Sequence, residues 1–217
     1  MARRVKQLSL SLSTWGGKRK GAGRKPKGKR ALVSHLSRPS LSRHQPLHVT
    51  LRRRDDAWNL RAGRMFKPLK RAFVAGGERF GMRLVRYSVQ GNHIHLIVEA
   101  HDKPSLSHGM QWLAARVART LNGLMGIRGR VWRERYHAHT LTAPREVRNT
   151  LVYVLMNARK HGVRLESGID PCSSAAWFDG FADHRPLVDD NPVSAPRTWL
   201  AGVGYTESRP INMRPEL

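Results

Sequence analysis

Two pairs of histidines in this sequence have the spacing of a metal-binding pair. His93 and His95 flank Ile94 in one run of β-forming residues, and His137 and His139 flank Ala138 in another. Because side chains alternate between the two faces of a strand, both histidines of a pair project from one face, where their imidazoles could chelate a divalent cation. The same spacing is typical of exposed polar positions on a half-solvated sheet, and it does not choose between the pairs.

A tyrosine and an asparagine near residue 155 offer a second kind of chemistry. Tyr153 and Asn157 are four residues apart on one flank of an expected helix, so their side chains should stack. A tyrosine hydroxyl beside a ligand for Mg²⁺ or Mn²⁺ can attack a phosphodiester, since the cation polarises the phosphoryl oxygen and the phosphotyrosine conserves bond energy for rejoining. The alternative is a boundary tyrosine next to a surface asparagine. Tyr136 is a competing nucleophile.

The elements that must position these residues are predicted from periodicity between residues 44 and 162. Strands are expected at 48–51, 82–89, 94–98 and 136–141, and helices at 58–75, from an N-cap at Ser105 onward, and from Pro144 to Gly162. Residues 90–92 should form a tight hairpin turn. The first six elements follow the split βαβ order of an α+β, ferredoxin-like domain, with a four-stranded antiparallel sheet and two helices on one face. The last helix is an addition to that plan.

Charge is distributed unevenly along the chain. Forty Lys and Arg residues against fifteen Asp and Glu give a formal net charge of +25, which favours a polyanionic partner, nucleic acid above all. No acidic residue precedes Asp55, so residues 1–43 are expected to form a basic arm that is disordered when free. We expect its cations to contact phosphates, namely Lys18, Arg19, Lys20, Arg24, Lys25 and Lys27. Residues 163–217 are expected to be a mostly irregular tail.

Other classes of protein fit the composition poorly. No apolar run approaches the ~20 residues of a membrane-spanning helix, and the N-terminus lacks the apolar core of a signal peptide. We therefore expect no membrane association and a cytoplasmic, nucleoid-associated protein. The single Cys172 cannot form an internal disulfide or a thiolate metal cluster. A metal would have to be held by His, Asn, Gln or carboxylate side chains.

Three blocks in chain order resemble one known group of enzymes. They are YSVQGNHIHLIV at 87–98, GRVWRERY at 129–136 and LVYVLMNARK at 151–160. Together they are similar to the single-tyrosine HUH transposases (IS200-like), most closely the REP-associated tyrosine transposases, over residues 44–162. The resemblance implies a ferredoxin-like domain whose extra helix carries the catalytic tyrosine. It also implies that His93 and His95 are metal ligands, that Asn157 stands at the third protein ligand, and that Tyr153 is the nucleophile.

The resemblance implies a function as well as a site. Its members are bacterial mobile-element enzymes that cut and rejoin single-stranded DNA beside short hairpins, leaving a 5′-phosphotyrosine and a free 3′-hydroxyl, with Mg²⁺ or Mn²⁺ as cofactor. Arg133 and Arg135 are expected to contact DNA. Members exist as monomers and as dimers, so a homodimer stays open. The alternatives are a DNA or RNA hairpin-binding regulator that does not cut, and a basic structural protein that binds phosphates without reading sequence.

Overall fold

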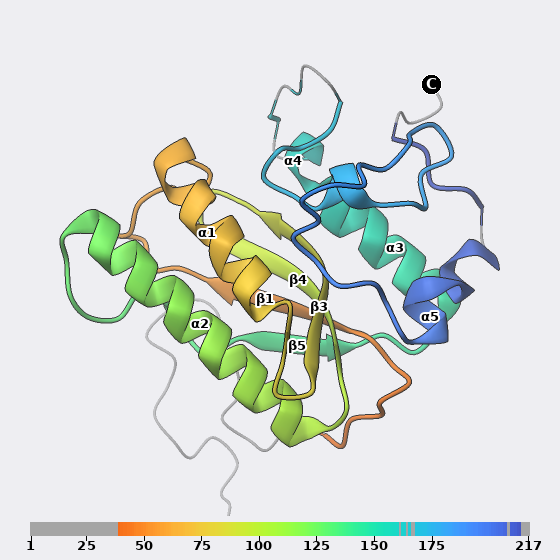
Figure 1. Ribbon diagram of the computed structural model, residues 1–217, viewed down its shortest axis with the longest axis horizontal. Helices are drawn as coiled ribbons and strands as arrows, with labels where there is room; N and C mark the ends of the chain where they lie inside the picture. Colours follow the sequence, from red (N-terminus) through yellow and green to blue (C-terminus); the bar gives the residue numbers. More distant parts are fainter. Residues whose placement is uncertain (1–38, 161, 164, 166–167, 208, 214–217) are drawn as a thin grey trace, which may run out of the picture. The chain divides into compact units, whose positions relative to one another are not determined.

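The computed structural model describes residues 39–160, 162–163, 165, 168–207 and 209–213. The main elements run in the order β1 (Leu47–Arg52), α1 (Gly63–Gly76), β2 (Glu78–Arg79), β3 (Met82–Val89), β4 (His93–Ala100), α2 (Lys103–Met125), β5 (His137–Thr140), α3 (Pro144–Leu155) and α4 (Asn157–Lys160) (Figure 1). Three short helical turns follow in the tail, η1 (Ala175–Trp177), α5 (Trp199–Gly202) and η2 (Gly204–Glu207).

The sheet confirms the predicted ferredoxin-like plan. Its strand order is β2-β3-β4-β1-β5, and every neighbouring pair is antiparallel. The fifth strand is a small addition at the edge, because β2 contributes only two residues that turn back onto the start of β3. The turn between them uses Gly81 at φ 74°, a left-handed conformation that glycine adopts without a steric penalty.

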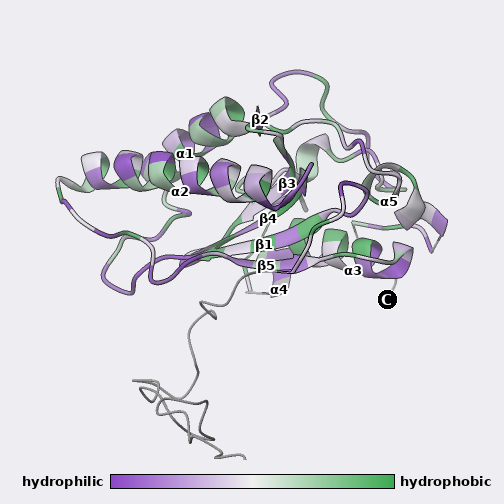
Figure 2. Cartoon of the chain, turned by 90° about the horizontal axis from the view of Figure 1, so that it is seen from below, coloured by the Kyte–Doolittle hydropathy of each residue, from purple (hydrophilic) through white to green (hydrophobic). Residues whose placement is uncertain are grey.

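Helices cover both faces of the sheet (Figure 2). α1 and α2 lie on one face and α3 lies on the other. The first face meets α1 and α2 in a core formed by Leu and Ile side chains with the aromatic rings of Phe73 and Tyr87. The second face packs Val85 and Ile97 against α3 and against residues of the tail. The added helix therefore has its own apolar surface, separate from the two-helix layer.

An extra residue interrupts the pairing of β3 with β4. Leu84 pairs with Val98 and Arg86 pairs with Ile97, so Val85 has no partner of its own and forms a β-bulge. Beyond the bulge, Tyr87 faces α1 and α2, while Ser88 lies directly opposite His95.

Two predicted helix starts were wrong. α1 begins at Gly63 rather than near residue 58, because the preceding residues form a turn in which the Asn59 side chain accepts from the Arg61 amide at 2.9 Å. α2 begins earlier than Ser105. Its N-cap is Asp102, whose carboxylate accepts from the Ser105 amide at 2.8 Å, a satisfied cap that Pro104 in the first turn permits.

The last predicted helix is broken. α3 ends at Leu155, and Asn157 begins the short α4, whereas the sequence predicts one helix up to Gly162. The Arg159 amide donates to the Met156 carbonyl at 3.2 Å, three residues back, so the chain tightens at this point. Tyr153 and Asn157 are consequently in different helical segments, so the single helix was wrong, while the stacking of these two side chains stays a prediction.

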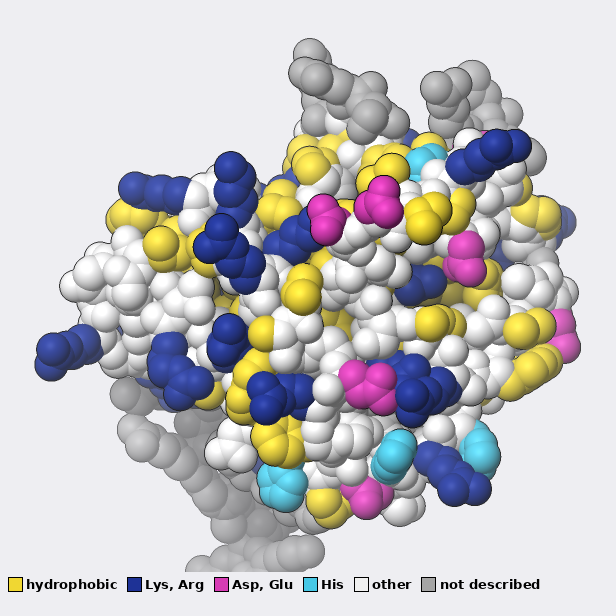
Figure 3. All heavy atoms as spheres, viewed as in Figure 1, with side chains coloured by type: hydrophobic (Ala, Val, Ile, Leu, Met, Phe, Trp, Pro, Cys, Tyr) yellow, Lys and Arg dark blue, Asp and Glu magenta, His cyan; other side chains and the backbone are white. Residues whose placement is uncertain are grey.

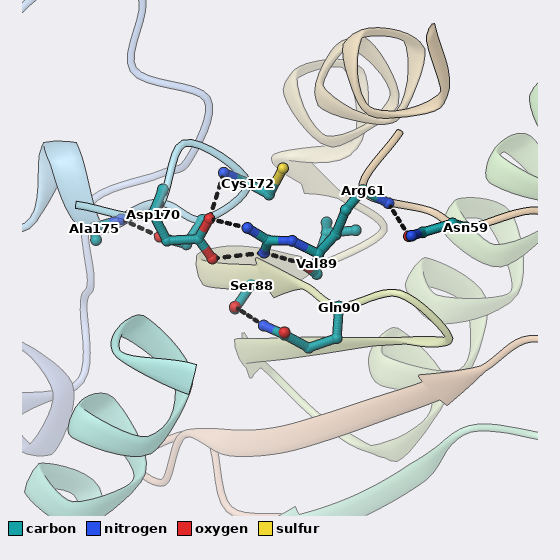
Figure 4. A network of polar contacts seen from close by, with 9 residues as sticks. Asn59, Arg61, Ser88, Val89, Gln90, Asp170, Cys172 and Ala175 are labelled. Carbon is teal, nitrogen blue, oxygen red and sulfur yellow. Dashed lines mark hydrogen bonds and ion pairs between the residues drawn. The ribbon is translucent and has the colours of Figure 1, made fainter. Parts of the chain in front are cut away.

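The tail is mostly irregular but packs closely. Phe178, Phe181 and Tyr205 enter the core on the α3 side of the sheet. Asp170 joins the tail to the rest of the domain through a bidentate ion pair with Arg61, with N–O distances of 2.7 and 2.8 Å (Figure 4). The Arg61 guanidinium also donates to the Val89 carbonyl, and the ion pair raises the pKa of Arg61.

A second connection to the tail lies at the C-terminal end of β4. The buried Glu99 carboxylate there accepts hydrogen bonds from the backbone amides of Arg197 and Thr198.

None of the helices described is both long and apolar enough to cross a bilayer.

Candidate active site

The two histidines of β4 converge on one point. His93 and His95 project from the sheet face that α3 covers, as the strand alternation predicts. Their Nε2 atoms are 2.8 Å apart, and their rings meet edge to face with centroids 4.5 Å apart. His95 is 4% exposed, whereas His93 is half-buried at the open end of the strand. Two ring nitrogens this close can share one cation or one proton.

The opposite nitrogen of each ring faces a polar group. Asn92 Oδ1 lies 2.6 Å from His93 Nδ1. His48 Nε2 and Thr50 Oγ1 lie 3.1 and 3.3 Å from His95 Nδ1. His48 and Thr50 come from β1, the neighbour of β4, where Thr50 pairs directly with His95. Contacts of this kind orient metal-binding imidazoles in proteins.

Tyr153 is the residue of α3 that reaches this pair. Its hydroxyl lies 3.4 Å from His95 Nε2, and the two rings are 5.0 Å apart in a T-shaped contact. The helix is held in place by Val147, Leu151 and Val154, which are buried against the sheet. Tyr153 is nevertheless 37% exposed. A substrate can therefore approach its hydroxyl from solvent.

Asn157 has the properties of an unused ligand. It is 1% exposed, and neither its amide oxygen nor its amide nitrogen has a hydrogen-bond partner. A buried amide without partners costs free energy, so this side chain suits a position where something else binds. Two converging imidazole nitrogens and an amide oxygen are a donor set that accepts Mn²⁺ and also Mg²⁺. The residues present thus fit a divalent metal.

The rival histidine pair is not part of this cluster. His137 and His139 lie on β5, on the same sheet face, but β1 separates them from β4. His139 instead contacts the Glu146 carboxylate at 2.6 Å and has a side chain that is 57% exposed. Within the described ranges, no three His, Cys, Asp or Glu residues form a group suited to a metal ion.

The rival tyrosine lies on the wrong side of the sheet. Tyr136 is partly buried against the core formed with α1 and α2, and its hydroxyl oxygen is inaccessible to solvent. The histidine pair faces the other way, so Tyr136 cannot attack a phosphate bound there.

The structure locates only part of the predicted DNA-binding set. Arg133 is exposed and lies 3.6 Å from Asp55, and Arg135 is partly exposed in the same loop before β5. Lys18, Arg19, Lys20, Arg24, Lys25 and Lys27 lie outside the described residues.

Sequence reasoning missed three contributors to the site, His48, Thr50 and Asn92. The alternation of polar His48 and Thr50 with apolar Leu47, Val49 and Leu51 was a usable signal, because it places both polar side chains on one face of β1. Which face that is depends on register, which the sequence pattern did not supply. Burial lowers the pKa of His48 to about 4, so its imidazole is neutral at pH 7.

A shallow cavity of about 550 Å³ opens next to Tyr153. It is lined by one flank of α3, including Arg145 and Asn149, two turns and one turn before the tyrosine. Arg145 is the cation that lines this cavity, and it is exposed. The lining of this open depression is mostly apolar and also includes Glu146, so Arg145 and Tyr153 are its groups that suit contact with a phosphate backbone.

Comparisons with known proteins identify the family and the fold of the chain. The family model described as "Transposase IS200 like" matches residues 47–156. A REP-associated tyrosine transposase, solved bound to a REP hairpin, superposes with a TM-score of 0.53 at 17% identity, covering 65% of this chain and 82% of that one. A structure assigned as a transposase of Deinococcus radiodurans R1 gives a TM-score of 0.37 at 17% identity, covering 52% and 87%. No curated protein matches the sequence.

Proposed function

The chain belongs to the IS200-like transposase family, and from that premise we propose that it cleaves and rejoins single-stranded DNA with Tyr153 as its nucleophile. The observation that carries this proposal is the 3.4 Å distance between the Tyr153 hydroxyl and His95 Nε2, at the point where His93 Nε2 also arrives. A nucleophile and two ring nitrogens then share a site on the protein surface. Attack by the hydroxyl oxygen on the phosphorus would form a 5′-phosphotyrosine and release a 3′-hydroxyl.

His93, His95 and Asn157 are the residues that would hold a divalent metal, Mg²⁺ or Mn²⁺. When bound, the metal would polarise the scissile phosphate and stabilise the charge that develops on its oxygens. The protein's own contribution is orientation. The buried side of α3 fixes the tyrosine, and the contacts at Nδ1 fix both imidazoles. All four residues come from a single chain, so the proposed site does not require a homodimer.

We propose a DNA hairpin as the substrate. The REP-associated transposase with the same fold was solved with a REP hairpin. The surface of this chain suits a polyanion, because α1 and α2 contain no Asp or Glu and carry five exposed cations, and Lys and Arg side chains gather on this part of the face shown in Figure 3. These are Arg64, Lys67, Arg71, Arg116 and Arg119. Duplex phosphates on these cations would add a salt-dependent contribution to binding.

The test is a covalent adduct. Labelled single-stranded DNA carrying the hairpin repeats that flank the gene is incubated with the full chain and Mn²⁺, and products are separated under denaturing conditions. We expect a protein–DNA adduct with the wild type and none with Tyr153→Phe or His95→Ala. Tyr136→Phe is the matched control, because that tyrosine faces the other core, and it should form the adduct normally.

Two outcomes would overturn the proposal. An adduct that survives in Tyr153→Phe and disappears in Tyr136→Phe would transfer the nucleophile to the other face. Tight hairpin binding without an adduct, on every flanking repeat and with either metal, would make the chain a non-cutting hairpin-binding regulator.

A further inference from the structure

Two side chains of β1 contact the Nδ1 edge of His95. His48 Nε2 lies 3.1 Å from this atom and Thr50 Oγ1 lies 3.3 Å from it. The His48 ring also stacks obliquely on the His95 ring, with centroids 5.1 Å apart, and contacts the edge of Tyr153 at 6.0 Å. His48 thus touches both the proposed ligand and the proposed nucleophile without taking part in either role.

A metal ligand must present an unprotonated nitrogen. His95 Nε2 faces His93 and Tyr153, so it can bind a cation only if the proton of the neutral ring is on Nδ1. That proton then needs an acceptor. At His93 the acceptor is the Asn92 amide oxygen, 2.6 Å from Nδ1. The two ligands therefore need the same arrangement, an acceptor at Nδ1 and a lone pair at Nε2.

We propose that His48 is a positioning residue, whose Nε2 accepts the Nδ1 proton of His95 and so directs the Nε2 lone pair of His95 to the metal. This inference rests on the proposed metal site. Thr50 is the weaker candidate, because its contact with Nδ1 is the longer of the two, 3.3 Å against 3.1 Å.

The position of His48 in the sheet explains why it can serve this role. His48 lies on β1 two residues before Thr50, the residue that pairs with His95. It is therefore diagonally across from His95, on the face that α3 covers.

The experiment measures metal affinity and the tautomer of His95 in the full chain. Mn²⁺ binding is followed by the electron paramagnetic resonance of free Mn²⁺, and the side-chain ¹⁵N shifts of the histidines are recorded without metal. For His48→Leu we expect Mn²⁺ affinity to fall by ~10- to 100-fold, the range known for partners of metal-bound histidines, and the His95 proton to redistribute toward Nε2. His48→Gln keeps an acceptor oxygen and should recover most of the affinity.

Two further variants serve as controls. His139→Gln alters the histidine that pairs with His48 across β1 and β5, and should leave Mn²⁺ affinity unchanged because His139 contacts Glu146 instead. Thr50→Val removes the competing hydroxyl and should change affinity by less than His48→Leu does. Thermal melts identify any variant that has failed to fold, and His48→Gln keeps the test valid if His48→Leu unfolds.

The inference is overturned if His48→Leu binds Mn²⁺ as the wild type does, or if Thr50→Val alone reproduces the loss. The adduct assay separates this failure from that of the proposed function. The wild type could bind Mn²⁺ through His95, lose affinity in His48→Leu and still form no adduct. That result would support the positioning role of His48 and overturn the proposed DNA cleavage. A wild type that binds no Mn²⁺ would overturn the metal site and His48's role together.

Discussion

The two faces of the sheet differ in what they bury. The face under α1 and α2 is apolar along every long strand, through Leu47, Val49 and Leu51 of β1, Leu84, Tyr87 and Val89 of β3, and Ile94, Leu96 and Val98 of β4. The face under α3 places polar side chains at the equivalent positions, among them His48, Thr50, Ser88, His95 and Glu99. The first face can be packed by local helices alone. The second needs partners for its polar groups, and these come from α3 and from the distant tail.

The comparison teaches where function can be placed in a small domain. The first face provides stability through its apolar core. The α3 side can therefore carry the half-buried His93, the buried His95 and the buried Asn157 amide, which has no hydrogen-bond partner. Each of the following changes tests that division, in order of decreasing expected effect.

Tyr153→Phe should remove activity and leave stability intact. We expect adduct formation to fall by at least ~10³-fold, because no other group can supply the oxygen nucleophile. The side chain is 37% exposed, so the free energy of unfolding should change by no more than ~0.5 kcal/mol. Adduct yield and urea denaturation, measured on the same preparation, check both parts. A large loss of stability would mean that Tyr153 belongs to the core.

Asp170→Ala should destabilise the side of the domain covered by the tail. The side chains of Asp170 and Arg61 are 1% and 16% exposed, and removing the carboxylate leaves a largely buried guanidinium without its charge partner. We expect a loss of about 3 to 5 kcal/mol in the free energy of unfolding, measured by urea denaturation. Asp56→Ala is the matched control, because it removes the carboxylate of an exposed ion pair with Arg54. It should not shift the midpoint of urea denaturation. Equal effects of the two variants would contradict a structural role for the tail.

Leu96→Ala should have the opposite signature to His95→Ala, although the two residues are neighbours on β4. Leu96 is fully buried under α1 and α2, so its truncation should cost about 2 to 5 kcal/mol of stability. Below the unfolding transition, its Mn²⁺ affinity should match that of the wild type. Loss of metal binding in folded Leu96→Ala would show that the two faces are coupled.

Glu146→Gln should give the smallest effect, and only above acidic pH. Hydrogen bonds from the Thr142 amide, followed by the contact with His139, hold the pKa of Glu146 below its ordinary value. A carboxylate with a lowered pKa in the folded state adds stability above the unfolded value, and this is lost as the pH falls through the folded value. Tm should therefore drop by ~2 °C or less at pH 7, with no difference from wild type at about pH 3. A difference that persists in acid would contradict this origin.

The predictability of the molecule follows the same division. Strand alternation and helical spacing predicted the order of the elements along the chain and the face shared by His93 and His95, because both depend on neighbours in sequence. The spacing alone could not separate His93 and His95 from His137 and His139, nor Tyr153 from Tyr136, because that choice depends on which strand lies beside β4 and which face α3 covers. The resemblance to HUH transposases made the choice that geometry now favours. The roles of Tyr153, His93, His95 and Asn157 stay predictions.

The contribution of His48 and the packing of the tail could not be predicted from the sequence, for a different reason. His48 contacts a residue 47 positions away through strand register, and Asp170 meets Arg61 from 109 positions away. Acidic, proline-containing stretches such as 163–217 have no periodicity to reveal such partners. The break between α3 and α4 was equally hidden, because the sequence there reads as a continuous helix.

The bulge at Val85 sets a rule for which insertions and deletions this strand can tolerate. Val85 and Arg86 both lie on the α3 face, so losing the one extra residue would remove the bulge and leave Tyr87 under α1 and α2 and Ser88 opposite His95. Losing two residues would instead reverse the alternation up to the hairpin and turn Tyr87 toward the face that α3 covers. Chains that still fold should therefore differ here by the single bulge residue, and a loss of two would have to be compensated between residue 86 and the turn at residues 90–92.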